Sequence, residues 1–554
     1  MQYLIILFFS LVVTILVTPY FIDLLNKIKI VDQPDGRRKL HATPVPRLGG
    51  LLIFIALFTS LFIFYGDLNA IKYFLFGAII IFTLGAYDDL IGARWYLKFI
   101  YQIVAAGLLL MQIIPKFSTL ILFDIEFSII PAAIILILFI VGTINSFNLL
   151  DGLDGLVAGI SLLVLSLLFF ISLNLLNTFL LVLCASIIGC LIGFLKYNAF
   201  PAKIFLGDSG SYILGFIVIN AVLLVSINSS ARTLDLTFPI IVLAVPIADT
   251  IKVLIERLFS GRHPFLADRN HIHHIVSSKN ITHKTTVFII TLYSILFAAN
   301  GIYYLFYSQP GGMLVFVILV LPLVFANRIL SFALNQKYLL VIGRTLNRFP
   351  QFILNYFRKL MIPGTAVFVL IYFLYLLVNH SSPVAEFMLP SILLIGLLIV
   401  FTLINYRKNK LLSDIIMFFN ILIFFILKQS DEIIYKDISQ LPILGNLNYN
   451  LLIIGVLLPV IGFYLLFRDR IRPQSGMLFS GLDLVIILLV LLMSVSSNLL
   501  PISNSYIVTD TIFRSFLVYF FLKILIQLQP KFRVPFYVLS FILVISTQII
   551  LLTL

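Results

Sequence analysis

Four side chains that can supply oxygen ligands recur at three-residue spacing near residue 150. Asn145, Asn148, Asp151 and Asp154 follow an apolar stretch, and a glycine follows each of the two aspartates. This spacing can collect amide and carboxylate oxygens on one side of a turn. Such ligands suit a hard cation such as Mg²⁺, which keeps several waters and is completed by substrate phosphates. The twelve-residue ligand pattern of an EF-hand is missing, and the structural alternative is that Asn and Asp cap broken helices.

Further carboxylates stand at the ends of apolar segments. Asp88 and Asp89 are adjacent and are followed by Lys98, and Asp208 stands in Phe-Leu-Gly-Asp-Ser-Gly-Ser at 205–211. Two neighbouring carboxylates at a membrane surface are costly unless a cation compensates them, and a lysine can pair with them or bind a phosphate. Asp208 could hold a metal or cap the next helix. For Asp249, inside the ninth apolar segment, we expect a supporting salt bridge rather than catalysis.

Cationic and hydrogen-bonding side chains concentrate in two loops. Residues 263–274 read His-Pro-Phe-Leu-Ala-Asp-Arg-Asn-His-Ile-His-His and hold four of the seven histidines. These donors suit a group with several anionic oxygens, so the pattern predicts a phosphate-binding loop; a basic loop that only obeys membrane topology is the alternative. A zinc site is disfavoured because both cysteines lie far away. The first polar loop has a basic tip at Lys39 and His41, which could hold an anion or act as a topogenic signal.

The composition places the chain in a lipid environment. Of 554 residues, 61% are hydrophobic and 11% charged, and the mean hydropathy is +1.15, so the sequence predicts a polytopic membrane protein. The net charge of +14 lies in short loops between apolar segments, and membrane topology explains it better than nucleic-acid binding. Cys184 and Cys190 share one apolar segment, and we expect free, packed thiols without a disulfide.

The apolar segments predict an all-α fold with about eighteen transmembrane helices. Eleven are expected near 3–22, 48–65, 70–87, 97–115, 128–146, 156–175, 178–195, 210–228, 237–256, 286–307 and 311–329, and seven more near 361–379, 386–405, 411–428, 450–467, 478–496, 511–528 and 535–553. No basic residue precedes the first segment and several follow it, so the N-terminus is expected outside and the basic loops in the cytoplasm. A small extracytoplasmic hairpin is predicted between Lys116 and Phe127.

Three regions are expected along the chain. Residues 1–335 form a membrane core that carries the polar motifs, residues 336–360 form a basic cytoplasmic linker with a possible interfacial helix, and residues 361–554 form an additional membrane region of unknown function. No buried polar group is expected to recur in this last region, so we interpret the region as a structural or partner-binding appendage. A membrane transporter or a lipid-linked sugar flippase is the alternative from another class, although polar residues on one membrane face argue against a transporter.

Four motifs in this order resemble a known family. Gly-Ala-Tyr-Asp-Asp-Leu at 85–90, Asn-Ser-Phe-Asn-Leu-Leu-Asp-Gly-Leu-Asp-Gly at 145–155, Phe-Leu-Gly-Asp-Ser-Gly-Ser at 205–211 and Asp-Arg-Asn-His-Ile-His-His at 268–274 resemble the polyprenyl-phosphate N-acetylhexosamine-1-phosphate transferases, the WecA/TagO-like branch of the MraY superfamily in glycosyltransferase family 4. The resemblance covers about residues 1–330. The family often has an acid three residues after the aspartate pair, where this chain has Gly92, which weakens the case for a three-carboxylate site.

The resemblance implies a role for each motif residue. Asn148 and Asp208 would hold Mg²⁺, with Mn²⁺ as an option; Asp88, Asp89 and Lys98 would be catalytic, with Lys98 binding the lipid phosphate and the two acids positioning or deprotonating it. Asp154 would read the uracil edge. The remaining expected substrate-binding residues are Asp151, Asn198, Lys39, His41, Arg262, His263, His271, His273 and His274.

The resemblance also implies a reaction. A UDP-N-acetylhexosamine, with GlcNAc as the first choice, would react with undecaprenyl phosphate to release UMP and start cell-envelope glycan synthesis; phospho-N-acetylmuramoyl-pentapeptide transfer is the alternative. The expected partners are these two substrates and the lipid bilayer, with a homodimer as an option and no nucleic acid. The expected location is the bacterial inner membrane, with the active site on the cytoplasmic side.

Overall fold

The computed structural model describes residues 2–33, 44–260, 271–277, 283–325, 350–378 and 505–529, together with scattered residues between 417 and 543. The chain divides into two compact units. One contains residues 3–335 and 480–500, and the other contains residues 1–2, 336–479 and 501–554. The first unit carries every predicted site residue, and each unit is described by itself.

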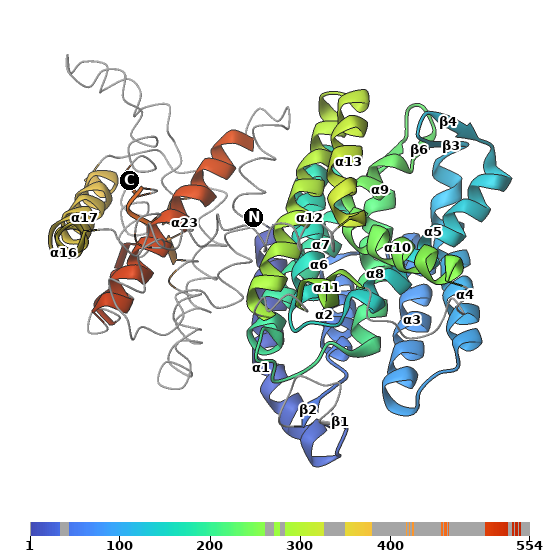
Figure 1. The fold of residues 1–554 in the computed structure, drawn as a ribbon, viewed down its shortest axis with the longest axis horizontal. Coiled ribbons are helices and arrows are strands. Elements are labelled where there is room, and N and C mark those ends of the chain that lie inside the picture. The colour runs from blue at the N-terminus through green and yellow to red at the C-terminus, as the bar shows by residue number, and fades with distance from the viewer. Residues whose placement is uncertain are drawn as a thin grey trace. The chain divides into compact units, whose positions relative to one another are not determined.

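The first unit is a bundle of apolar helices (Figure 1). Its long helices are α1 (Gln2–Lys27), α2 (Gly50–Phe64), α3 (Lys72–Ile91), α4 (Trp95–Ile113), α5 (Ile129–Leu150), α6 (Leu156–Leu175), α7 (Thr178–Asn198), α8 (Gly207–Val225), α12 (His283–Phe306) and α13 (Gln309–Val324). Short 3-10 turns, η1 (Leu68–Ile71) and η2 (Ile114–Lys116), flank α3 and α4. Within the described residues of the whole chain, nine helices are long and apolar enough to cross a membrane.

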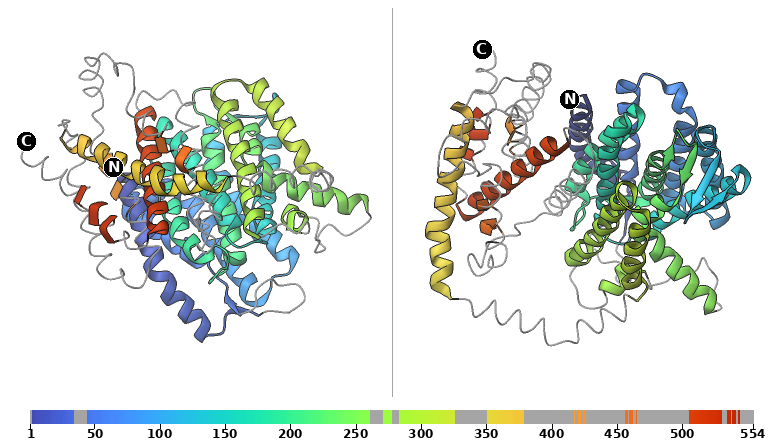
Figure 2. Two further views of the ribbon diagram at one scale, coloured as in Figure 1. Left: turned by 60° about the vertical axis from the view of Figure 1, so that its left-hand side comes forward. Right: turned by 90° about the horizontal axis from the view of Figure 1, so that it is seen from above.

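Ten of the eleven spans predicted in this region are confirmed as single helices. The prediction of one helix for the ninth span is wrong. The predicted span 237–256 is two helices, α9 (Thr237–Val242) and α10 (Ala244–Phe259), which meet at Leu243. Pro246 explains the break because it has no N–H to donate to the carbonyl of Val242 and its ring clashes with that carbonyl. Both views in Figure 2 show α10 extending away from the other helices, and Phe259 at its end is 90% exposed.

α8 is the central helix of this unit. Its span is 94% buried, against 39% for the spans of α4 and α5, and it packs against α2, α3, α5 and α6. Small residues permit these contacts: a Cβ on Gly50 of α2 would lie 2.3 Å from the backbone nitrogen of Gly210 in α8. Because the helices around α8 touch it closely, groups at its N-terminus meet side chains from several of them.

The predicted hairpin after Lys116 is confirmed and belongs to a larger sheet. β3 (Thr119–Leu122) and β4 (Ile125–Phe127) pair antiparallel, and β3 also pairs in parallel with β6 (Thr233–Asp235), which pairs antiparallel with β5 (Ile227–Asn228). A separate two-stranded ladder joins β1 (Val31–Asp32) to β2 (Val45–Pro46). The two sheets lie at opposite ends of the unit (Figure 1).

The second unit contains α16 (Gln351–Tyr356), a π-helical turn η3 (Phe357–Met361), α17 (Ile362–Val378) and α23 (Ser505–Leu528). α17 and α23 coincide with the spans predicted near 361–379 and 511–528; the other five late spans fall mainly outside the described residues. The expectation that no polar group is buried here is wrong. Arg514 is 3% exposed and donates to the hydroxyl of Tyr372 at 3.2 Å, and Lys523 is 7% exposed.

Both cysteines are buried and free in the structure, as predicted. α7, which carries both cysteines, packs closely against α1, because a Cβ on Gly189 of α7 would lie only 2.0 Å from the carbonyl oxygen of Leu7. The thiols therefore serve as small apolar groups in helix packing.

Candidate active site

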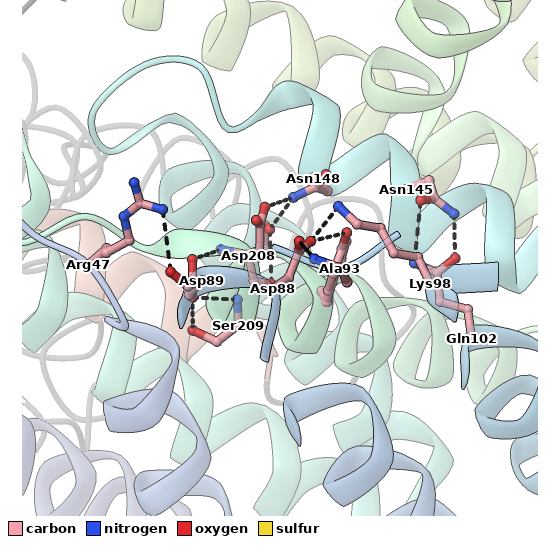
Figure 3. Close-up of polar contacts among 12 residues, drawn as sticks. Arg47, Asp88, Asp89, Ala93, Lys98, Gln102, Asn145, Asn148, Asp208 and Ser209 are labelled. Atoms are coloured by element: carbon pink, nitrogen blue, oxygen red, sulfur yellow. Dashed lines mark hydrogen bonds and ion pairs between the residues drawn. The ribbon is translucent and has the colours of Figure 1, made fainter. Parts of the chain in front are cut away.

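Asp89 caps the N-terminus of α8. Its Oδ1 accepts from the backbone N–H of Asp208 at 2.9 Å, and its Oδ2 accepts from the backbone N–H and the hydroxyl of Ser209 at 3.0 and 2.7 Å. The first N–H groups of a helix have no partner within the helix, and a carboxylate there also meets the positive end of the helix dipole. Asp89 therefore holds α8, and with it Asp208, in place against α3 (Figure 3).

Asp88 has a different environment although it is the adjacent residue. Its Oδ2 lies 2.5 Å from Nζ of Lys98 and accepts from the hydroxyl of Tyr212 at 3.1 Å. Its Oδ1 accepts from the N–H of Ala93 at 2.8 Å. The chain reaches Ala93 through Gly92, which ends α3 with a φ of +85° that L side chains rarely adopt. Gly92, where the chain departs from the family pattern, thus makes the turn that brings the Ala93 N–H to Asp88.

Asn148 and Asp208 lie in contact, so they are close enough to share one ion. Nδ2 of Asn148 lies 2.5 Å from Oδ1 of Asp208 and 3.0 Å from Oγ of Ser211. The oxygen and nitrogen of an asparagine amide occupy nearly the same shape, so a 180° turn would present Oδ1 beside the Asp208 carboxylate. In that orientation the amide and carboxylate oxygens would both be available as ligands to a hard cation.

A fourth polar contact joins α4 to α5 beside these pairs. Nδ2 of Asn145 donates to Oε1 of Gln102 at 2.6 Å, and Nε2 of Gln102 donates back to Oδ1 of Asn145 at 3.3 Å. Gln102 is 0% exposed and lies one helical turn after Lys98. Figure 3 shows this pair next to Lys98.

The loop that follows α5 and the loop that follows α7 hold each other. Oδ2 of Asp154 accepts from the N–H of Ala202 at 3.0 Å, and Oδ1 of Asn198 accepts from the N–H of Gly155 at 3.1 Å. Nδ2 of Asn198 donates to the carbonyl of Ile204 at 2.9 Å. Both ends of the Asn198 amide thus bond to the backbone, and the side chain is buried, so Asn198 holds the two loops together.

Several carboxylates at this end of the bundle lie close enough to raise one another's pKa. Burial, followed by the charges of Asp208, Asp89 and Asp154, raises the pKa of Asp151 well above its usual range. Asp208 in turn lies within electrostatic range of Asp88, Asp89 and Lys98. No three His, Cys, Asp or Glu side chains of the described residues form a metal site by themselves. Asp208 and Asn148 carry the carboxylate and amide oxygens that a hard cation takes when water and phosphate complete its shell.

The first loop is attached to the same end. Arg47 forms an ion pair with Asp32 and donates to the carbonyl oxygen of Asp89 at 3.4 Å. The N–H groups of Gly49 and Gly50 donate to the carbonyls of Phe205 and Leu206, each at 3.0 Å. The predicted binding residues Lys39 and His41 of this loop lie outside the described residues, as do Arg262 and His263 of the histidine segment.

His271 begins the described part of the histidine segment. Its Nδ1 lies 2.9 Å from Oδ2 of Asp249, and the N–H of Ile272 donates to Oδ1 of the same carboxylate at 2.7 Å, which starts the short helix α11 (Ile272–Ser277). Asp249 thus has a polar partner, as expected, and the contact is a salt bridge when His271 is protonated. His273 and His274 lie in α11. The start of α12 lies near the loop of Asp154, because the ring of His283 stacks on that of Phe200 at 4.4 Å.

Three residues of this site had no role in the sequence interpretation. Ser209 and Tyr212 follow Asp208 in the same motif, so their position beside an acid was a usable signal. Gln102 offered a weaker one, as an amide inside an apolar span four residues after Lys98. A buried polar group in a membrane helix needs a partner, but the sequence does not say which helix supplies it.

Comparison with known proteins gives consistent results. The model of glycosyl transferase family 4 matches residues 71–226, which include Asp88, Lys98, Asn148 and Asp208. A Bacillus subtilis (strain 168) protein described as a probable undecaprenyl-phosphate N-acetylglucosaminyl 1-phosphate transferase is 35% identical over 303 residues, which cover 53% of this chain and 82% of the relative.

Two further relatives carry closely similar names. The undecaprenyl-phosphate alpha-N-acetylglucosaminyl 1-phosphate transferase of Thermotoga maritima is 33% identical over 309 residues, which cover 55% of this chain and 91% of the relative. The Escherichia coli (strain K12) protein of the same name is 28% identical over 290 residues, which cover 50% of this chain and 77% of the relative. The similarity thus covers about half of this chain, and with the membrane-length helices it indicates an integral membrane protein.

Proposed function

The chain belongs to the family of undecaprenyl-phosphate N-acetylglucosaminyl 1-phosphate transferases, and from this premise we propose that it transfers N-acetylglucosamine 1-phosphate from UDP-N-acetylglucosamine to undecaprenyl phosphate. The observation that carries the proposal is the pairing of Lys98 with Asp88 beside the pairing of Asn148 with Asp208. One pair offers a cation for a lipid phosphate, and the other offers oxygens for a metal-bound donor. Phosphoryl transfer needs mainly positioning and charge neutralisation.

The donor half of the site consists of Asn148, Asp208 and the loops around Asp151 and Asp154. Asn148 and Asp208 would hold Mg²⁺, or Mn²⁺ in its place, and the ion would neutralise charge on the donor pyrophosphate. Asp89 holds Asp208 at the start of α8. Asp154, whose loop is fixed through Ala202, would read the uracil edge. In this proposal the sugar and pyrophosphate would be bound by His271, His273, His274, Arg262 and His263, and Lys39 and His41 would also bind substrate.

The acceptor half consists of Lys98 and Asp88. Lys98 would bind the phosphate of undecaprenyl phosphate, and Asp88 orients the ammonium group from 2.5 Å. The second pKa of a phosphate monoester is about 6, so much of the lipid phosphate is already a dianion near neutral pH. An oxygen of this dianion attacks the β-phosphorus of the donor, the bond from that phosphorus to the bridging oxygen breaks, and UMP leaves with the electron pair. No strong general base is then required.

A single in-line step is proposed rather than an aspartyl-phosphate intermediate. Asp88 already accepts from Lys98, Tyr212 and the Ala93 N–H, so its oxygens are engaged rather than poised to attack. The unmodified enzyme should accumulate no phosphorylated protein when it is incubated with donor alone, and the residual rate of an Asp88→Asn enzyme should rise between about pH 5 and pH 7 as the lipid phosphate becomes a dianion. Isolation of a phospho-aspartate from the unmodified enzyme would contradict the single step.

The proposed location is the bacterial inner membrane with the site facing the cytoplasm. Basic residues concentrate in loops that alternate crossings place on one side, as the positive-inside rule requires of the cytoplasmic face. A cysteine introduced near Lys98 should be labelled by an impermeant maleimide only after cells are opened. Labelling of intact spheroplasts would reverse the orientation.

The direct test is a donor panel. Purified full-length protein in lipid nanodiscs is incubated with undecaprenyl phosphate, Mg²⁺ and radiolabelled UDP-GlcNAc, UDP-GalNAc or UDP-N-acetylmuramoyl-pentapeptide, and UMP release and lipid-linked radioactivity are followed. We expect UMP and labelled lipid with UDP-GlcNAc, loss of both with EDTA, and recovery with Mg²⁺. Turnover of the pentapeptide donor alone, or of none of the three, would refute the proposed function.

A further inference from the structure

Four polar contacts link four helices into a closed ring at the active end of the bundle. Asp88 and Lys98 join α3 to α4, and Asn148 and Asp208 join α5 to α8. Asp89 joins α3 to α8 through the start of α8. The fourth contact, between Gln102 and Asn145, joins α4 to α5 and completes the ring. Figure 3 shows these contacts side by side.

We propose that the Gln102–Asn145 pair is a positioning device that sets the distance between the lysine for the lipid phosphate and the metal ligands for the donor. The inference rests on the proposed function. Lys98 lies four residues before Gln102 on α4, and Asn148 lies three residues after Asn145 on α5. Residues at these spacings lie on the same helix face, so a shift between the two amides moves Lys98 relative to Asn148.

The pair is built for rigidity rather than for ligand contact. Gln102 is 0% exposed, and the two amides donate to each other, which is a cyclic arrangement with both partners satisfied. Nδ2 of Asn145 also donates to the carbonyl of Val141 at 2.8 Å, which fixes the side chain on its own helix. Water competes weakly inside a membrane bundle, so such a pair keeps one register between two helices.

α4 and α5 also pack against each other, while their outer faces are exposed, including Tyr101 at 45% and Leu138 at 68%. Van der Waals packing and hydrogen bonds both contribute to helix association in lipid. The amide pair adds directional bonds to this packing, so it favours one register between the two helices.

The test separates positioning from stability. Gln102→Met with Asn145→Leu replaces both amides by apolar groups of similar size, which costs little stability because no polar group remains unsatisfied. We expect kcat for UMP release to fall by about 10- to 100-fold, since a misplacement near 1 Å can cost that much, while KM for UDP-GlcNAc and for undecaprenyl phosphate changes less than about threefold, because the binding groups are untouched. The exchange Gln102→Asn with Asn145→Gln keeps the total length of the pair and should restore most of kcat.

The matched control lies on the same helix. Oε1 of Gln112, at the other end of α4, accepts from the N–H of Phe74 at 3.0 Å, so Gln112→Met also removes a buried bond between helices. It should lower the melting temperature in detergent and leave kcat per folded molecule unchanged.

If the Met/Leu variant keeps the kcat of an active wild-type enzyme, the positioning inference is wrong and the proposed function still stands. If the length-exchanged pair is as slow as the Met/Leu pair, the register argument is wrong. An inactive wild-type enzyme would instead refute the proposed function.

Discussion

The two ends of the first unit use the same kinds of polar contact for opposite purposes. At the sheet end, Oδ2 of Asp235 accepts from the hydroxyl of Tyr304 at 2.8 Å, and Oδ1 accepts from the N–H of Thr237 at 2.8 Å. One carboxylate there is satisfied by a tyrosine hydroxyl and a backbone N–H. At the active end, several carboxylates lie close enough to repel one another, and they share Lys98 and a helix N-terminus. The difference teaches that repelling carboxylates are kept together where substrates are proposed to bind, whereas matched donors and acceptors stabilise the fold.

The largest expected effect on activity comes from Asp208, the proposed anionic metal ligand. Asp208→Asn should lower kcat by about 10³-fold, because one anionic metal ligand is lost at a centre where charge neutralisation supplies most of the rate. UMP release measured over a range of Mg²⁺ concentrations gives the result, and saturation should require more Mg²⁺. Asp67→Asn, which alters an exposed carboxylate that caps η1, serves as the control. Retention of wild-type activity in Asp208→Asn would dismiss the metal assignment.

Substitutions of the two adjacent acids should have different effects, one on kinetics and the other on stability. Asp88→Asn removes the charge that faces Lys98, so KM for undecaprenyl phosphate should rise and kcat/KM fall by about 10²-fold, while the melting temperature stays close to wild type. Asp89→Asn turns an amide NH₂ toward N–H donors of α8, so the free energy of unfolding should fall by about 1–3 kcal/mol. Steady-state kinetics and thermal melts on both variants decide this. Identical losses in both measurements would show that the two carboxylates act as one group.

Close helix packing beneath the active end gives a smaller effect. Gly50→Ala places a Cβ 2.3 Å from the backbone nitrogen of Gly210, so α2 and α8 must separate, at a cost of about 1–3 kcal/mol. A lower melting temperature and a proportional loss of active protein are expected. Gly107→Ala on α4 meets nothing within 4 Å and should be neutral or slightly stabilising. Equal melting temperatures for the two variants would refute the packing argument.

The sheet end should give the smallest effect on activity. Tyr304→Phe removes one hydrogen bond to Asp235, so the free energy of unfolding should fall by about 1 kcal/mol and kcat should not change. Thermal melts and UMP release on the same preparation check both parts. A fall in kcat of tenfold or more would mean that the two ends are coupled, which the comparison does not allow.

Much of the helical order follows from the sequence because a lipid core imposes simple demands. Runs of about 20 apolar residues must be helical to satisfy their backbone, so the spans from 3 to 329 were placed close to α1–α13. The break at Leu243 was missed, although Pro246 was visible, because the hydropathy of residues 237–256 stays high across it. The burial of Arg514 in α23 is not predicted either, because its partner Tyr372 is 142 residues away in the sequence.

By itself, the sequence determined the chemical inventory of this protein: carboxylates, amides, a lysine and histidines at the ends of apolar helices, in an order shared with one family. Only the tertiary structure decided how the inventory is divided. Asp88 and Asp89 are neighbours in the chain, but successive residues on a helix point about 100° apart, so one meets Lys98 on α4 and the other meets the start of α8. Which helix stands in each direction is set by packing between distant segments, and that packing also brought Gln102 to Asn145.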